Sequence, residues 1–173
     1  MKELLLRGAR YNAWANGLFI GVLLMLDDEA LDREILSSFP SIRKTVLHIW
    51  GAENIWLQRF ERVAKPVWKG SAFTGPMAEL GNAWRTSSAQ LLSFTEAQDE
   101  KTLRQLVSGI NMKGEAFADP LEAALQHIVN HGSYHRGQLV TMLRQVGVTS
   151  IPQADLIVYV RLMGDQESFA ERG

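Results

Sequence analysis

Residues 121–146 carry apolar or small side chains at alternating steps of four and three, which is the spacing of one face of an α-helix. The members of this stripe are Leu121, Leu125, Ile128, Gly132, His135, Leu139, Met142 and Val146. A stripe of this width must be buried against other elements of the fold. It has a histidine near its middle, and a buried imidazole is costly unless its ring nitrogens find partners. This one segment therefore indicates a helical bundle and also a candidate site.

Three further segments have helical spacing and, with residues 121–146, predict an all-α, up-down four-helix bundle. They cover approximately residues 2–26, 41–64 and 77–98. Ser41 is a suitable N-cap for the second of them, and Pro66 disfavours helix in the residue before it. Pro120 is placed in the first turn of the last long helix, where its missing N–H is tolerated. A short fifth helix is expected over residues 152–163, followed by a frayed tail over residues 165–173.

Two segments between the helices contain turn-forming residues. Residues 65–76 include two prolines and two glycines and so predict a loop. Residues 101–119 contain Gly109, Asn111 and Gly114 between short apolar runs, for which a small β-hairpin is one interpretation. The acidic residues 27–29 are interpreted as a connection. Because the chain contains no interdomain linker or repeat, we expect a single domain over residues 1–173.

The composition excludes several classes of function. The net charge of −1, without a basic stripe, argues against nucleic acid or an anionic membrane as a partner. The absence of cysteine excludes disulfides, thiolate metal ligands and a cysteine nucleophile. The apolar run over residues 18–26 is far shorter than the roughly 20 residues that span a bilayer. We therefore expect a soluble, cytoplasmic protein.

The chain has four histidines, of which three lie within residues 121–146. His131 and His135 are four residues apart, so they lie one turn apart on nearly the same helix face. A projection at roughly 100° per residue places His131 about 40° from His135, and His127 about 40° further round. The pair could hold one divalent metal ion, whereas His127 is marginal. The alternative is that both are hydrogen-bonded core histidines without a metal.

His48 is the natural third ligand because it lies in a separate helical segment. Its projection lies off the main apolar stripe of that segment, on the side shared with Ala52 and Ile55, so its direction is open. Three imidazoles would leave a divalent ion with its full charge and an open coordination position, as in catalytic zinc sites. Zinc, nickel and iron are all compatible with this ligand set.

Over nearly its whole length the chain resembles the DinB-like (YfiT-like) superfamily of bacterial metal-binding helical bundles. The matching segments are residues 11–16 (YNAWAN), 47–57 (LHIWGAENIWL), 130–138 (NHGSYHRGQ) and 152–159 (PQADLIVY). In that family three histidines hold the metal, and they correspond here to His48, His131 and His135. The resemblance thus implies that the His48 side chain points toward His131 and His135. It also agrees with the projection in not assigning His127 as a ligand.

The resemblance implies a metal-dependent enzyme that activates a low-molecular-weight thiol, such as bacillithiol or mycothiol, for attack on a small electrophile. An S-transferase in stress defence or detoxification is the leading interpretation, with a hydrolase that activates water as a variant. A non-catalytic metal-binding or interaction protein, whose ion joins two helices, is the alternative. The resemblance also implies a small-molecule substrate and a homodimer. No residue is assigned as general acid or base.

Several residues near the predicted ligands could support them. Glu53 follows His48 by five residues, a rotation of about 140°, so we interpret it as a neighbour of the site and not a ligand. Tyr134 and Gln138 could orient substrate or a ligand N–H, although packing between helices is the favoured interpretation for Tyr134. Arg136 projects away from His135, which favours a salt bridge or a dimer contact.

Two residues outside the histidine segments are also candidates. Asp155 lies near the expected start of the fifth helix, where a carboxylate is favoured by the helix dipole. Trp68 lies in the loop at 65–76 and is the tryptophan most suited to line a pocket or an oligomer surface.

Overall fold

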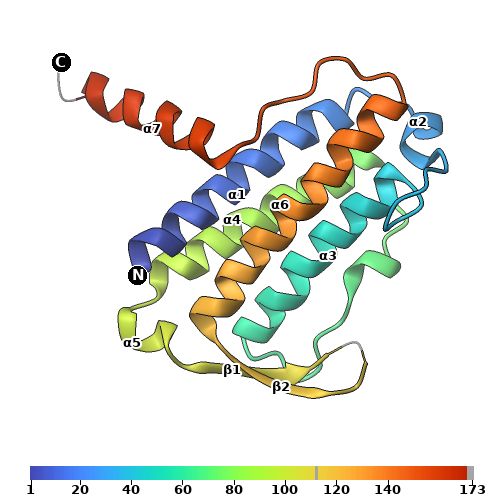
Figure 1. Cartoon of the computed structure of the whole chain (residues 1–173). Helices are drawn as coiled ribbons and strands as arrows, with labels where there is room; N and C mark the ends of the chain where they lie inside the picture. Colours follow the sequence, from blue (N-terminus) through green and yellow to red (C-terminus); the bar gives the residue numbers. More distant parts are fainter. Residues whose placement is uncertain (112, 171–173) are drawn as a thin grey trace.

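The computed structural model describes residues 1–111 and 113–170, and the side chains of residues 164–170 are not described. Four long helices form a bundle, and their packing is shown in Figure 1. They are α1 (Lys2–Leu23), α3 (Ile42–Phe60), α4 (Met77–Ala97) and α6 (Leu121–Gln145). Helix α1 packs against α4 and α6, and α3 packs against the same two helices, so α1 and α3 are diagonal partners. The predicted four-helix bundle is confirmed.

The ends of the long helices have local causes. Ser41 caps α3 as predicted, because its side chain accepts a hydrogen bond from the backbone N–H of Lys44. Helix α3 ends at Phe60, about one turn earlier than predicted. Arg62 there takes a left-handed backbone with φ of 56°, which stops the helix. Pro120 is the N-cap residue of α6 and lies just before its first turn.

The segment at residues 61–76 returns along α3 and determines the direction of α4. The Gln58 amide pairs with both the N–H and the carbonyl of Val67, at 2.8 and 2.9 Å. Further on, Trp68 lies against Gly51, and the ring of Phe73 lies 5.5 Å from that of Trp50. The chain thus travels back to the start of α3 before α4 begins. The order along the chain is therefore up-down-down-up, and strict alternation does not hold (Figure 1).

Short elements complete the connections. The predicted hairpin is present as β1 (Leu106–Ile110) and β2 (Ala116–Pro120), an antiparallel pair that lies across one end of the bundle. Two helical turns were missed, α2 (Asp28–Asp32) and α5 (Glu100–Leu103), and a 3₁₀ turn, η1, covers Lys69–Ser71. Asp27 and Asp99 cap α2 and α5 by accepting backbone N–H groups. The acidic residues interpreted as a connection therefore begin a helix.

Helix α7 (Leu156–Ala170) projects from the bundle, as Figure 1 shows. It begins four residues later than predicted and continues past Met163, with Asp155 directly before its first residue. The predicted frayed tail is helical over residues 165–170, and residues 171–173 lie outside the described residues. Tyr159 attaches the start of α7 to α1, because its ring packs on Tyr11 and Trp14 at 6.1 and 5.4 Å.

The core of the bundle lies where the four long helices meet. Its fully buried side chains include Phe19 of α1, Ile49 of α3, Trp84 of α4 and Leu139 of α6. The predicted stripe of α6 faces inward, since its members from Leu121 to Met142 are buried. Over the described residues, no helix combines the length and the apolar character that crossing a membrane requires.

Candidate metal centre

Three histidines converge between α3 and α6. His48 comes from α3, and His131 and His135 come from successive turns of α6. One ring nitrogen of each lies within 4.8 Å of those of the other two. The Nε2 atoms of His48 and His131 are 3.0 Å apart. Nitrogen ligands of one tetrahedral zinc ion, each about 2.0–2.1 Å from it, lie roughly 3.4 Å apart. The three rings therefore need only small rotations to share one ion.

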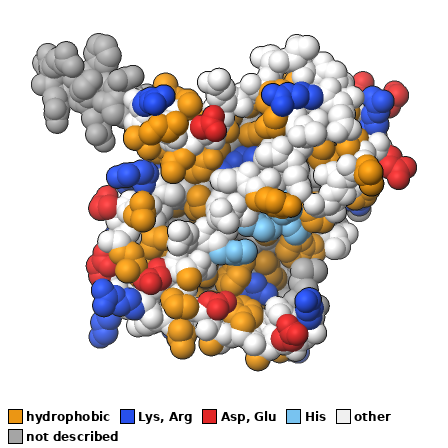
Figure 2. Space-filling view, viewed as in Figure 1, with side chains coloured by type: hydrophobic (Ala, Val, Ile, Leu, Met, Phe, Trp, Pro, Cys, Tyr) orange, Lys and Arg blue, Asp and Glu red, His pale blue; other side chains and the backbone are white. Residues whose placement is uncertain are grey.

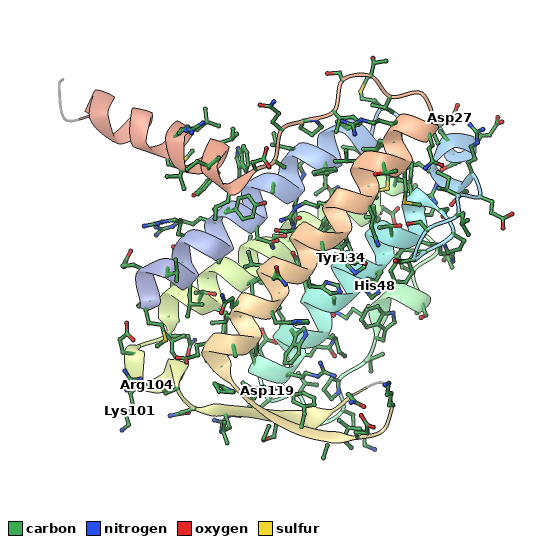
Figure 3. All side chains as sticks on the ribbon, in the orientation of Figure 1. Asp27, His48, Lys101, Arg104, Asp119 and Tyr134 are labelled. Atoms are coloured by element: carbon green, nitrogen blue, oxygen red, sulfur yellow. The ribbon has the colours of Figure 1, made fainter. Side chains whose placement is uncertain are left out.

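The rotation of α3 about its own axis points the His48 side chain toward α6. The helix projection alone had left the direction of this side chain open. In Figure 3 the labelled His48 lies between α3 and α6, close to Tyr134 in this view. Two aromatic rings hold it from the other sides: Phe39 stacks on it at 4.1 Å, and Trp68 lies at 5.6 Å. His48 is thereby held with its Nε2 toward the pair on α6.

Burial keeps two of these imidazoles neutral. Loss of solvent, followed by repulsion from His135, lowers the pKa of His48 to about 4. The same two causes, with smaller contributions from His48 and His127, lower the pKa of His131 to about 3. At neutral pH both rings therefore carry a free lone pair. This is the form of histidine that binds a metal.

A hydrogen-bond chain orients the third ring. His135 is 6% exposed, and its Nδ1 lies 2.7 Å from Oε1 of Gln138. Because an amide oxygen can only accept, Nδ1 carries the proton and Nε2 is left free for a metal. Gln138 is held in turn by donating from Nε2 to Oγ of Ser38 at 2.7 Å. Gln138 is therefore placed to orient the N–H of His135, and its role beside a metal ligand stays a prediction.

The site is open to solvent on one side. Figure 2 shows histidine surface in the middle of the face that α3 and α6 present. Tyr134 is 63% exposed, and its ring meets the edge of His135 at 4.9 Å, so the interhelical packing favoured for it is wrong. His127 is exposed and stands outside the three-histidine cluster, as its projection indicated. Three imidazole nitrogen donors beside an open side fit a divalent metal with a free coordination position.

A comparison with protein-family models gives one decisive match. The model described as the DinB family matches residues 1–167.

This chain belongs to the DinB family.

Individual relatives agree with the assignment. The chain is 30% identical over 149 residues to Protein DinB of Bacillus subtilis strain 168, covering 82% of this chain and 86% of that protein. A crystal structure of a DinB-like protein from Bacillus cereus has a TM-score of 0.69 at 20% identity, covering 87% of this chain and 95% of the other. A second, the DinB-like protein YjoA from Bacillus subtilis, has a TM-score of 0.62 at 15% identity, covering 86% and 96%. These two structures support the fold.

In this DinB-family chain a carboxylate is buried on α3, the helix that carries His48. Glu53 of α3 is 2% exposed and accepts hydrogen bonds from Asn12 and Asn16 of α1 at 2.6 and 2.8 Å. Its second oxygen accepts from Ser88 of α4 at 2.9 Å. Burial raises the pKa of the Glu53 carboxyl, while these three donors and the charge of Arg136 oppose the rise. As predicted, Glu53 is a neighbour of the site and not part of the cluster.

Arg136 completes this network from α6. Its guanidinium is buried and donates to Oδ1 of Asn12 and of Asn16 at 2.9 and 2.7 Å. A further bond goes to Oγ of Ser133 at 2.9 Å. The predicted salt bridge or dimer contact is therefore wrong. The two asparagines stand between the cation and the Glu53 carboxylate, so the opposite charges interact through the amides.

The two asparagines were not identified from the sequence as partners of Glu53 and Arg136. They lie one turn apart on α1, and both are essentially unexposed in the apolar core. Two amides at a spacing of four on the mostly apolar face of α1 were the available signal, because buried amides require partners. The contacts of Phe39 with His48 and of Ser38 with Gln138 could not be predicted from residue spacing. Both residues lie in an irregular segment between helices.

Acid should destabilise the metal-free protein. An unperturbed histidine has a pKa of 6.5, against about 4 for His48 and about 3 for His131 when folded. Below pH 6.5 the unfolded state therefore binds more protons, and the free energy of unfolding falls as pH drops. Urea unfolding of EDTA-treated protein between about pH 7 and about pH 4 measures this slope. His131→Ala should flatten it and His127→Ala should not; equal slopes for wild type and His131→Ala would contradict the assignment.

Glu53 and Arg136 should be energetically coupled without touching. Removing either one leaves the other buried charge without compensation, which costs about 3 kcal/mol or more. A double-mutant cycle of Glu53→Gln and Arg136→Met, measured by urea unfolding, should therefore give a coupling energy above about 1 kcal/mol. Glu79→Gln, at an exposed position of α4, is the matched control for loss of a carboxylate. Additive effects of the two core substitutions would mean that the asparagines do not transmit the interaction.

Proposed function

We propose that the chain binds one divalent metal ion through His48, His131 and His135, and that the bound ion serves an enzyme of the thiol S-transferase type. The observation that carries the proposal is the convergence of three imidazole nitrogens within 4.8 Å on a side open to solvent. A structural zinc site usually closes with four protein ligands, whereas three leave a position for a reactant.

When bound at such a site, a divalent ion supplies Lewis acidity, which stabilises a thiolate or hydroxide near neutral pH. The chain's own residues provide the conditions for this. Burial keeps His48 and His131 unprotonated, and Gln138 holds the proton of His135 on Nδ1. Phe39 and Trp68 exclude water from two sides of His48, while the Tyr134 hydroxyl group stands at the exposed edge.

The choice between an enzyme and a structural ion depends on solvent access. A closed site would favour an ion that only joins α3 to α6. Here His48 and His131 are half-buried, and Trp68, the neighbour of His48, also lines a cavity. These features support the enzyme, with a water-activating hydrolase as its variant. Zinc, nickel and iron all suit the donor set. The small-molecule substrate, the homodimer and the stress or detoxification setting implied by the resemblance stay predictions.

Elemental analysis of the purified protein tests the metal. We expect about one ion per wild-type chain and a loss of most of it in His48→Ala, His131→Ala and His135→Ala, because each removes a nitrogen donor. His127→Ala is the matched control and should keep wild-type content. Gln138→Ala should weaken affinity by roughly 10- to 100-fold, since it frees the orientation of His135. Equal metal content in wild type and all three ligand variants would show that the ligands are wrong.

A thiol assay tests the enzyme. With bacillithiol and 1-chloro-2,4-dinitrobenzene, the sulfur forms a C–S bond to the ring, chloride leaves with its bonding pair and the thiol proton goes to solvent. We expect the rate of thiol loss to depend on metal loading and to fall in His131→Ala to the rate without protein. Identical rates for metal-loaded and EDTA-treated protein would remove the thiol transferase and leave the non-catalytic metal-binding protein.

A further inference from the structure

A cavity of about 1090 Å³ lies at the end of α3 that faces the hairpin, between residues 61–68 and strand β1. We call it the hairpin cavity. Its size reaches the upper end of the range typical of small-molecule sites, roughly 300–1,000 Å³. Aromatic and aliphatic side chains form much of its wall, among them Phe60, Trp68, Phe94 and Val107. It is therefore suited to the apolar body of a ligand.

The charged side chains that line the hairpin cavity all have one sign. Arg59, Arg62 and Lys65 line it, and none of the lining residues in the described part of the chain is acidic. Figure 2 shows hydrophobic, Lys or Arg, and Asp or Glu surface below the histidines, so acidic side chains lie on this face although the described lining of the cavity includes none. A site with apolar walls and only cations favours a ligand that has an apolar body and an anionic group.

Arg59 is the cation best placed to bind such a group. Its guanidinium lies over the rings of Trp56 and Phe117, at 4.7 and 5.0 Å from their centroids. One hydrogen bond, to the carbonyl of Ile110 at 3.1 Å, is its only hydrogen bond among the described residues. The aromatic rings hold the guanidinium in place, and its other N–H groups are left for a ligand. A planar guanidinium held in this way suits a carboxylate or a phosphate.

Arg62 supplies a second observation. It has a φ of 56° just after the end of α3, a position that glycine usually occupies at a helix end. A side chain there costs free energy that glycine would avoid. Such strain is typical of positions where the side chain has a use. Arg62 contributes a cation to the cavity.

The hairpin cavity is aligned with the metal centre along α3. His48, Ile55 and Arg59 are separated by seven and four residues, so they share one helix face over a rise of about 16 Å. Ile55 and Arg59 line the cavity. Trp68 also lines it, and its ring lies 5.6 Å from that of His48. A ligand anchored at Arg59 and reaching the histidines would therefore be elongated, roughly 10–16 Å long.

We propose that the hairpin cavity binds an elongated organic anion, with its carboxylate or phosphate at Arg59, Arg62 and Lys65 and its apolar body against Ile55 and Trp68. The further step, that this anion is the substrate on which the metal centre acts, rests on the proposed function. Binding of the anion itself does not need the metal.

Calorimetric titration of the zinc-loaded protein with octanoate and with octan-1-ol tests the proposal. Octanoate should bind at least about tenfold more tightly, because only it accepts charge-assisted hydrogen bonds. Arg59→Gln should weaken octanoate binding about tenfold and leave octan-1-ol nearly unchanged. Arg62→Gly should weaken octanoate severalfold while the melting temperature stays the same or rises, since glycine relieves the strained backbone. Arg144→Gln, an exposed substitution on α6, is the matched control and should bind as wild type does.

Equal affinity for octanoate and octan-1-ol, or equal losses in Arg59→Gln and Arg144→Gln, would overturn the proposal. If Arg59→Gln does not fold, Arg62→Gly still tests the proposal, because this variant is expected to keep the fold. His131→Ala separates this inference from the proposed function, because it should lose metal and keep octanoate. If the wild-type protein holds its metal but does not bind octanoate, only the cavity proposal is wrong. If the wild-type protein binds octanoate but holds no metal, only the proposed metal centre is wrong.

Discussion

The interaction on which the site depends is the buried pairing of Glu53 and Arg136 through the amides of Asn12 and Asn16. Two opposite charges in a bundle core destabilise the fold unless every donor and acceptor is matched, so the network tolerates little relative movement. It joins α1, α3 and α6, and Ser88 adds α4. Glu53 and Arg136 lie on the same two helices as the histidines. The network therefore fixes the relative rotation of the helices that bring the imidazoles together.

The histidine cluster is a second constraint with its own local causes. Three rings at this separation would repel one another if protonated, and burial removes that charge from His48 and His131 at neutral pH. Gln138 then selects the tautomer of His135, because its amide oxygen accepts the proton on Nδ1. Ser38 reaches Gln138 from the segment between α2 and α3. The donor atoms are thus prepared for a cation before one arrives, which reduces the reorganisation that binding requires.

The segment between α3 and α4 connects this cluster to the hairpin cavity. It follows α3 backwards because Gln58 pairs with the backbone of Val67 and because Gly51 leaves room for the Trp68 indole ring. A Cβ at Gly51 would lie 2.7 Å from that ring, so only glycine permits the contact. The return makes α4 parallel to α3 and places Trp68 beside both His48 and the cavity. The bundle topology and the position of Trp68 between His48 and the cavity are therefore both consequences of one segment.

Much of the architecture could be predicted from the spacing of apolar residues along the chain, because every α-helix places residues three and four apart on one face. The Ser41 cap was predicted from its residue type. The helix geometry predicted the four long helices and the shared direction of His131 and His135, and it made His127 a less suitable ligand. It could not determine the direction of His48, the partners of Arg136 or the exposure of Tyr134. Those depend on how far α3 and α6 rotate about their axes, which is settled by contacts between residues more than 80 positions apart, such as His48 with His131. The sequence by itself determined which donor atoms the chain can offer; only the tertiary structure decided that they meet, because packing, buried charge and a returning loop act across the whole bundle.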